Sequence, residues 1–115
     1  NKGKLKVSEK DLQRGIIDYL TIKGALVHKV NNVGIKKLDG SYIPPREKGV
    51  ADILACYKGY FIAIEVKGTG GKVSEYQEDF LDRVQDAGGF ALTVRDLDEV
   101  QELIRMLDKE IRGGL

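Results

Sequence analysis

The chain has little cysteine, histidine or proline, and it has no tryptophan. Because Cys56 is its one cysteine, no disulfide can form within the chain, and the apolar segment around Cys56 predicts a small buried side chain in a reducing compartment. His28 is the one histidine, whereas a structural zinc site needs a cluster of Cys and His ligands. Disulfide scaffolds and zinc-stabilised folds are therefore excluded.

Apolar runs are also short. None approaches the roughly 18 residues that a membrane-spanning helix needs, and no signal-peptide apolar region opens the sequence. The 115 residues suffice for one hydrophobic core but not for two. We therefore expect a single domain over residues 1–115, without membrane contact, in the cytoplasm of a bacterium or of the host of a phage.

The net charge is only +1, but the charges are distributed unevenly. Residues 1–72 contain 14 Lys and Arg against 7 Asp and Glu, whereas residues 73–115 contain 5 against 11. A basic half is suited to a nucleic-acid backbone, and the acidic half can face away from it. The first four lysines can instead form a solvated tail, namely Lys2, Lys4, Lys6 and Lys10.

Two apolar segments flank the dipeptide Lys58-Gly59 and predict a β-hairpin. If this dipeptide is a two-residue loop, the register sets Asp52 opposite Glu65, with Cβ atoms roughly 4.5–5.5 Å apart. Two carboxylates this close repel each other unless a cation lies between them, and Mg²⁺ prefers oxygen ligands of this kind. A three-residue loop beginning at Tyr57 would break the pairing and leave an ordinary solvated strand end.

The end of the second hairpin strand places a lysine beside this pair. Side chains alternate along a strand, so Glu65 and Lys67 share one face while Val66 points into the opposite layer. Lys67 is then close enough to orient a water molecule or to neutralise charge on a phosphate. The surrounding apolar residues indicate buried strands, and charged groups at the ends of buried strands are seldom accidental.

The rest of the chain alternates between helical and strand patterns. The capping-box spacing of Ser74 and Gln77 opens the second helix. This order of elements predicts an α/β fold in which α-helices flank a mixed central β-sheet. Outside the hairpin, the apolar spacing predicts a helix at residues 9–23, a strand at 25–30, a short hairpin at 35–43, a helix at 75–87, a strand at 90–94 and a last helix from 97.

The segment from residue 31 to residue 48 is a long excursion rich in turn signals, and long loops in small domains tend to be functional. Its basic and amide side chains make it a candidate DNA-contacting arm, with an ordinary polar loop as the alternative. The glycine-rich segment after residue 67 lacks the spacing of a P-loop, so we expect no nucleotide cofactor. Its glycines would let the chain turn from sheet to helix or would let phosphates approach. The candidate DNA-binding residues are Lys29, Asn31, Asn32, Arg46, Lys48 and Lys72.

Three ordered motifs resemble the PD-(D/E)XK nuclease superfamily, and specifically its VRR-NUC (virus-type replication-repair nuclease) branch. The superfamily often has proline before the motif aspartate, where this chain has Ala51. Such a proline affects backbone shape rather than chemistry. The resemblance covers about residues 8–100, and its motifs are Gly49-Val50-Ala51-Asp52, Ile64-Glu65-Val66-Lys67 and Ser74-Glu75-Tyr76-Gln77.

The resemblance implies a restriction-endonuclease-like core and a site for Mg²⁺ or Mn²⁺. Asp52, Glu65 and the backbone carbonyl of Val66 would hold the metal. Lys67 would assist the attacking water.

Two further catalytic residues are implied by the resemblance. Gln77 would support the site, and a glutamate of the first helix, best matched by Glu9, would complete the catalytic set. Both residues have structural alternatives, because Gln77 fits a capping box and an acidic residue such as Glu9 in the first turn of a helix is favoured by the helix dipole.

We therefore expect a metal-dependent DNA endonuclease that acts on branched DNA such as Holliday junctions in replication, repair or recombination. A homodimer is expected, because one small domain offers little surface for a junction whereas two-fold symmetry presents two sites to two strands. One alternative is a non-catalytic nucleic-acid-binding module with the same fold, which a missing carboxylate or lysine would favour. Another is a nucleotide phosphohydrolase, which would usually need more acidic ligands and a base-binding pocket.

Overall fold

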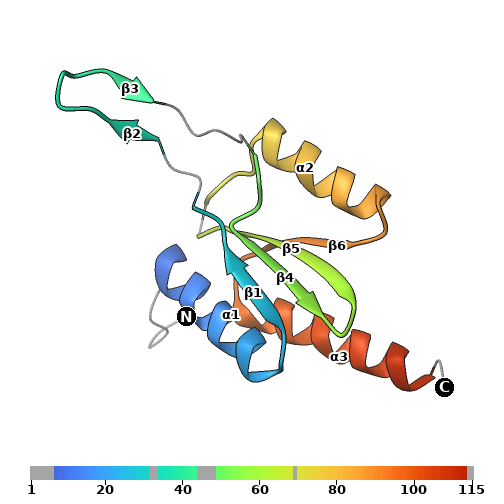
Figure 1. The fold of residues 1–115 in the computed structure, drawn as a ribbon. Coiled ribbons are helices and arrows are strands. Elements are labelled where there is room, and N and C mark those ends of the chain that lie inside the picture. The colour runs from blue at the N-terminus through green and yellow to red at the C-terminus, as the bar shows by residue number, and fades with distance from the viewer. Residues whose placement is uncertain (1–6, 32–33, 44–48, 69, 114–115) are drawn as a thin grey trace.

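The computed structural model describes residues 7–31, 34–43, 49–68 and 70–113. Helices and strands alternate along these ranges in the order shown in Figure 1. Their bounds are α1 Glu9–Ile22, β1 Leu26–Lys29, β2 Ile35–Lys36, β3 Tyr42–Ile43, β4 Ile53–Tyr57, β5 Tyr60–Val66, α2 Glu75–Asp86, β6 Phe90–Val94 and α3 Leu97–Gly113.

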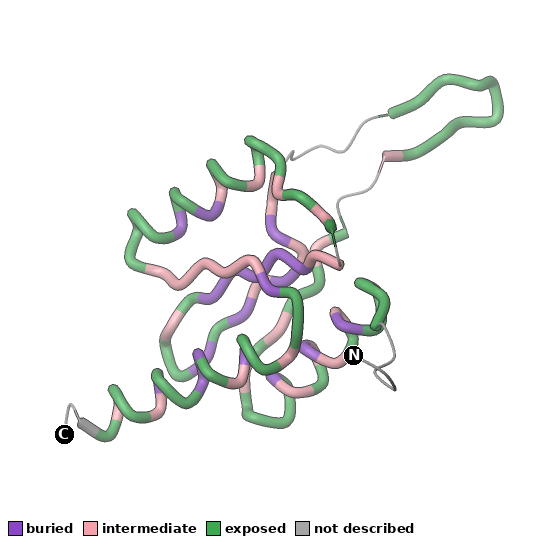
Figure 2. Tube along the Cα trace, turned by 180° about the vertical axis from the view of Figure 1, so that it is seen from behind, coloured by how far each residue is buried: buried purple, intermediate pink, exposed green. Residues whose placement is uncertain are grey.

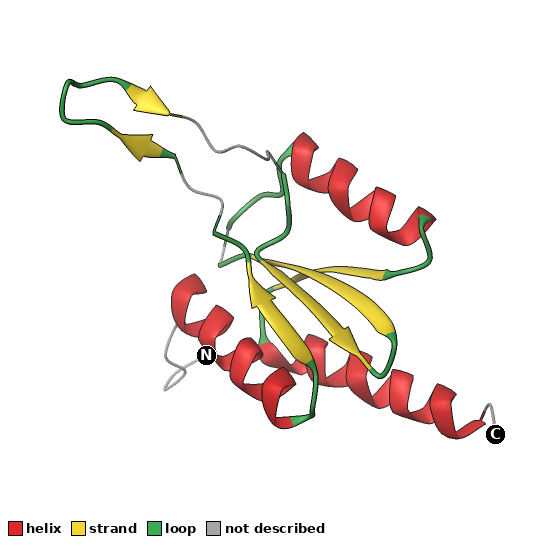
Figure 3. Cartoon of the chain, in the orientation of Figure 1, coloured by secondary structure: helices red, strands yellow, loops and turns green. Residues whose placement is uncertain are grey.

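Four strands form the central sheet in the order β1-β4-β5-β6. Neighbouring strands are antiparallel from β1 to β5, whereas β6 runs parallel to β5. Helices α1 and α3 lie on one face of the sheet and α2 lies on the other (Figures 1 and 3). The expected α/β fold with a mixed central sheet between helices is confirmed. None of the described helices is long and apolar enough to cross a membrane.

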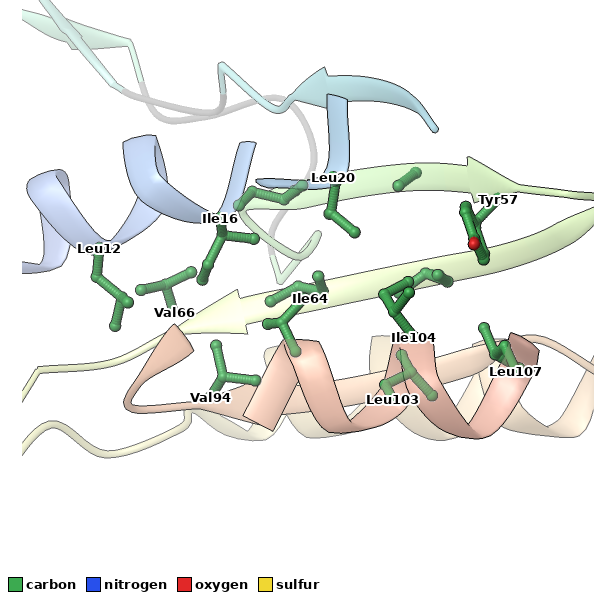
Figure 4. Close-up of a cluster of buried hydrophobic side chains, with 14 residues drawn as sticks. Leu12, Ile16, Leu20, Tyr57, Ile64, Val66, Val94, Leu103, Ile104 and Leu107 are labelled. Carbon is green, nitrogen blue, oxygen red and sulfur yellow. The ribbon is translucent and has the colours of Figure 1, made fainter. Parts of the chain in front are cut away.

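The main core lies between the sheet and the helices α1 and α3 (Figure 4). Leu12, Ile16 and Leu20 recur at helical spacing on α1 and are buried, as the apolar periodicity predicted. Val66 packs into the same layer and is 2% exposed. Because strand side chains alternate, the burial of Val66 in this layer turns its neighbour Glu65 toward the face that carries α2.

A two-residue turn joins β4 to β5. Lys58 and Gly59 both have positive φ angles, 48° and 88°, as a type I′ turn requires. Tyr57 pairs with Tyr60 and Ile53 pairs with Ile64. The predicted hairpin register is thus confirmed, and the three-residue loop that would have separated the two carboxylates is excluded.

The expectation that Cys56 is buried is wrong. Cys56 is exposed, and Leu26 and Phe61 on the neighbouring strands are 78% and 43% exposed. On this face of the sheet the buried cluster under α2 is formed by Ala51, Ala63, Leu81 and Val84, and it does not include any of these three side chains. The apolar pattern around Cys56 correctly predicted a strand, but burial on a second face depends on which helix covers it.

A second hairpin, β2–β3, projects from the body of the domain as an arm that is exposed along its length from residue 35 to residue 43 (Figures 1 and 2). Asp39 Oδ1 closes its turn by accepting hydrogen bonds from the Ser41 N–H at 2.9 Å and the Ser41 hydroxyl at 2.6 Å. The chain leaves β1 for this arm beside Asp52, because the Val30 N–H donates to the Asp52 carbonyl at 2.8 Å. The predicted hairpin is therefore present and begins at the end of the sheet where Asp52 lies.

Gly49, three residues before Asp52, has a φ of 85°, and a Cβ at this position would lie 2.3 Å from the backbone oxygen of Tyr76 in α2. Gly88, beyond the other end of α2, has a φ of 97°, and a Cβ there would meet nothing within 4 Å. Left-handed backbone costs an alanine about 1–2 kcal/mol at either position. We expect both Gly49→Ala and Gly88→Ala to lower the free energy of unfolding. The loss should be larger for Gly49→Ala by ~1 kcal/mol or more, because its new methyl group must also displace the backbone of α2. Equal losses in urea denaturation would contradict the close approach.

Candidate metal centre

Glu65 is the one buried charged side chain among the described residues, at 1% exposure, and it lies near the end of β5. Its Oε2 atom accepts a hydrogen bond from Gln77 Nε2 at 2.5 Å and forms an ion pair with Lys67 Nζ at 3.1 Å. Its Oε1 atom is buried and has no hydrogen-bond partner. A buried carboxylate oxygen without a partner is unfavourable, so the protein alone leaves this atom in need of a proton or a cation.

Asp52 lies directly before β4, and the register Ile53–Ile64 sets it next to Glu65. Its Oδ2 atom accepts a hydrogen bond from the Val66 N–H at 2.8 Å, which fixes the Asp52 side chain at the end of β5. Burial, which has the largest effect, and the negative charge of Asp52 together raise the pKa of Glu65 to about 7, although Lys67 acts to lower it. The structure therefore brings together the predicted ligands Asp52 and Glu65 and the predicted lysine.

The chemistry of this cluster fits a hard divalent cation. Mg²⁺ is usually held by one or two carboxylates while water and phosphate oxygens fill the remaining positions. Asp52 and Glu65 are two such carboxylates, and the unpartnered Glu65 oxygen is an available donor. No group of three or more His, Cys, Asp or Glu side chains that could hold a metal occurs in the described part of the chain. The cluster thus resembles a site that shares its metal with substrate rather than a closed structural site.

Gln77 makes contacts that are compatible with both roles between which the sequence left a choice. Its side-chain oxygen accepts from the Ser74 N–H at 3.0 Å, and the Ser74 hydroxyl accepts from the Gln77 N–H at 3.2 Å, which completes the capping box of α2. Its side-chain nitrogen donates to Glu65. One amide therefore starts α2 and holds the buried carboxylate, so the position of α2 is tied to the site.

Glu9 lies in the first turn of α1, and its Oε1 atom accepts a hydrogen bond from the Gly68 N–H at 2.9 Å. Gly68 follows Lys67 directly. Glu9 is thereby held beside the backbone of the site, but within the described residues no hydrogen bond or ion pair joins it to Asp52 or Glu65. Its proposed catalytic role stays a prediction.

A basic hollow lies between α1 and β1, on the face of the sheet that carries α1. It is lined by Lys10, Arg14, Ile17 and Lys29 and has a volume of about 210 Å³. Lys10 follows Glu9, and Lys29 pairs with Ile53, the residue after Asp52, so the hollow lies toward the same end of the sheet as the site. Among the ion pairs of the described residues, none involves these three cations.

The sequence analysis identified Lys29 but missed Lys10 and Arg14 as its neighbours. Their spacing of four residues places them on one helix face, which could have indicated the cluster, but only the packing of α1 beside β1 brings Lys29 to them. Asn31 and Lys72 are exposed. The other three candidate DNA-binding residues, Asn32, Arg46 and Lys48, lie outside the described residues.

Comparison with known proteins agrees with this geometry. The family profile of the VRR-NUC domain matches residues 30–95. A solved structure described as a VRR_NUC domain superimposes with a TM-score of 0.61 at 22% identity, covering 84% of this chain and 94% of its own. A second, described as a VRR_NUC domain protein, gives a TM-score of 0.59 at 16% identity, with 88% of each chain covered. Among curated proteins no significant match is found.

The fold and the family profile together define a nuclease-type domain. The chain belongs to the VRR-NUC family of the PD-(D/E)XK superfamily. The resemblance noted on the three motifs is thereby confirmed, while the roles of the individual site residues rest on the geometry described above.

The raised pKa of Glu65 makes stability depend on pH. Because the pKa rises from 4.5 to about 7 on folding, the contribution of this group is fully present below pH 4.5 and is lost as the pH rises through 7. In metal-free buffer we expect the free energy of unfolding to fall by ~2–3 kcal/mol from pH 5 to pH 8 on account of this group. Glu65→Gln should remove this part of the slope, whereas Glu102→Gln, which changes an exposed acid on α3, should retain it. Parallel pH profiles of denaturant unfolding for the parent and Glu65→Gln would contradict the assignment.

Proposed function

We propose that this domain is a Mg²⁺- or Mn²⁺-dependent endonuclease that hydrolyses phosphodiester bonds of branched DNA, such as Holliday junctions, in replication, repair or recombination. The observation that supports the proposal best is the buried Glu65 carboxylate, which has one unpartnered oxygen and lies beside Asp52. A structural role alone gives no reason to bury a carboxylate next to a second one. Membership of the VRR-NUC family supports the same reaction class.

Each residue of the site has a task that its contacts support. Asp52, Glu65 and the Val66 carbonyl would hold the metal, which when bound polarises the scissile phosphate and lowers the pKa of a water molecule. The Lys67 ammonium, 16% exposed and paired with Glu65, would orient the attacking water or bind a phosphate oxygen as its charge increases. Gln77 keeps Glu65 in place through its bond to the same carboxylate oxygen.

The basic hollow gives the DNA backbone a path to this site. Lys10 and Arg14 lie four residues apart on α1 and repel each other, and Lys29 from β1 adds to the repulsion. A bound phosphate would reduce this repulsion by neutralising positive charge. The arm offers Lys36 and Lys37, and both are exposed. Phosphate contacts of this kind position DNA without reading its sequence, as a structure-selective enzyme requires.

A homodimer would extend this surface. One domain of 115 residues presents one metal site, whereas cleavage of a branched junction needs two strands to be held at two sites. Two-fold symmetry supplies both sites from one sequence. We therefore propose that the cutting species is a dimer.

Cleavage assays with three variants test the reaction and the roles together. The parent, incubated with Mg²⁺ or Mn²⁺ and a panel of linear, flapped and four-way DNAs, should cut, with preference for four-way junctions, and should lose activity when the metal is chelated. Asp52→Asn and Glu65→Gln preserve the shape of each side chain but remove the charge, so cleavage should vanish in both. Lys67→Met should still bind metal but cut ~10²–10³-fold more slowly, because it lacks a charged donor for the transition state.

The outcomes of these assays discriminate between the candidate functions. Binding of all DNAs without cleavage in any metal would favour a non-catalytic binding module. Cleavage by a protein that sediments as a monomer, with no preference for branches, would retain the nuclease but overturn the junction-cutting dimer. Activity of Glu65→Gln equal to that of the parent would show that the site is assigned incorrectly.

Salt dependence tests the proposed DNA path. Each phosphate that the protein neutralises contributes about −0.9 to the slope of log affinity against log salt concentration. Removing Arg14 and Lys29 together by alanine substitution should make the slope shallower by ~1–2 for every DNA sequence tested. The matched control is the double variant Lys109→Ala with Arg112→Ala, which removes the same amount of charge from the C-terminal part of α3. It should leave the slope close to that of the parent. Equal slopes for the two double variants would exclude the basic hollow from the DNA path.

A further inference from the structure

Arg95, between β6 and α3, holds the loop that follows Lys67. Its Nη1 atom donates to the carbonyl of Gly68 and its Nη2 atom donates to the carbonyl of Gly71, both at 2.7 Å. The backbone of Arg95 is itself fixed, because its N–H donates to Glu99 Oε1 at 2.8 Å. The guanidinium therefore spans two carbonyls of one short loop from a fixed point 24 to 27 residues away in sequence.

The same loop contacts two residues of the proposed active site. The Gly68 N–H donates to Glu9 Oε1 at 2.9 Å. The backbone N–H of Gly68 is therefore bonded to α1, and its carbonyl oxygen is bonded to Arg95. The Gly71 N–H donates to the Gly68 carbonyl at 3.1 Å and closes the turn. A Cβ at Gly71 would lie 3.4 Å from Lys67 Cδ, so this turn packs along the lysine side chain. A shift of the loop would displace Glu9 and Lys67 together.

The chemistry of Arg95 favours a geometric role. A planar guanidinium can donate to two acceptors at once in a fixed orientation, whereas a lysine ammonium on a flexible chain cannot reproduce this fork. Among the ion pairs of the described residues, none involves Arg95. Its contacts are carbonyl oxygens, which need hydrogen bonds but carry no net charge to neutralise.

We propose that Arg95 is a positioning residue for the nuclease reaction, acting through the Gly68–Gly71 turn to hold Lys67 and Glu9 at the metal centre. This proposal rests on the proposed function. It adds a residue that lies outside all three motifs of the sequence and forms no contact with the carboxylates. A misplacement of about 1 Å in a catalytic group can cost ~10²-fold in rate, so loss of the turn should affect catalysis before it affects binding.

Single-turnover kinetics at saturating DNA separate positioning from charge. Arg95→Ala should lower the rate ~10- to 100-fold, while its affinity for DNA, measured without divalent cations, changes no more than that of Arg105→Ala. Arg105 is a matched control because it is exposed on α3 and pairs with Glu102. Arg95→Lys should restore only part of the rate, since one ammonium cannot bridge both carbonyls. Full rescue by lysine, or a loss confined to affinity, would make Arg95 a phosphate contact and overturn the proposal.

Hydrogen exchange and a double variant complete the test. Exchange of the Gly68 and Gly71 amides should accelerate in Arg95→Ala, while exchange of the Gly40 amide, in the turn of the arm, stays unchanged. This readout needs no activity, so it tests the loop even if the parent cuts no DNA and the proposed function fails. In kinetics, Arg95→Ala combined with Glu9→Gln should lose less than the product of the single losses, because both residues act through one turn. Unchanged amide exchange, or losses that multiply, would overturn the proposal.

Discussion

The Glu65 carboxylate is buried at the end of β5, and the neighbouring elements place polar side chains against it. A charge removed from water requires donors, and both donors, from Gln77 and Lys67, reach the same oxygen. The second oxygen remains buried without a partner, and this burial, together with the negative charge of Asp52, raises the pKa of Glu65 to about 7. The start of α2 and the path of the chain after β5 are therefore determined as much by this carboxylate as by the packing of apolar side chains.

Much of the fold could be predicted because its determinants are local. Apolar runs on either side of Lys58-Gly59 specified a hairpin, and a two-residue loop leaves one register. That register is what brings Asp52 to Glu65, so the pairing of the carboxylates followed from turn chemistry without knowledge of the tertiary structure. Helix starts at Ser8 and Ser74 were predictable for the same reason, because a capping side chain bonds to backbone only three residues away.

What could not be predicted depends on packing between distant segments. Arg95 bonds to carbonyl oxygens, which every residue possesses, so its partners leave no signature in side-chain types. The exposure of Cys56 follows from how much of the sheet α2 covers, which strand periodicity does not report. For Gln77, the sequence offered a cap and a catalytic support as alternatives, whereas in the structure one amide both caps α2 and donates to Glu65, so the two roles do not exclude each other.

Helix α1 lies entirely before residue 30, where the match to the family profile begins, and all of α3 lies after residue 95, where the match ends. Yet Glu9 bonds to the loop after Lys67, and the buried Ile16 and Leu20 cover the face of the sheet opposite the metal centre. The region that the family profile matches is thus shorter than the folded domain, which includes α1 and α3. Domain boundaries drawn from similarity alone would give a fragment that keeps the proposed metal-binding carboxylates but lacks α1 and α3, the two helices that bury the opposite face of the sheet.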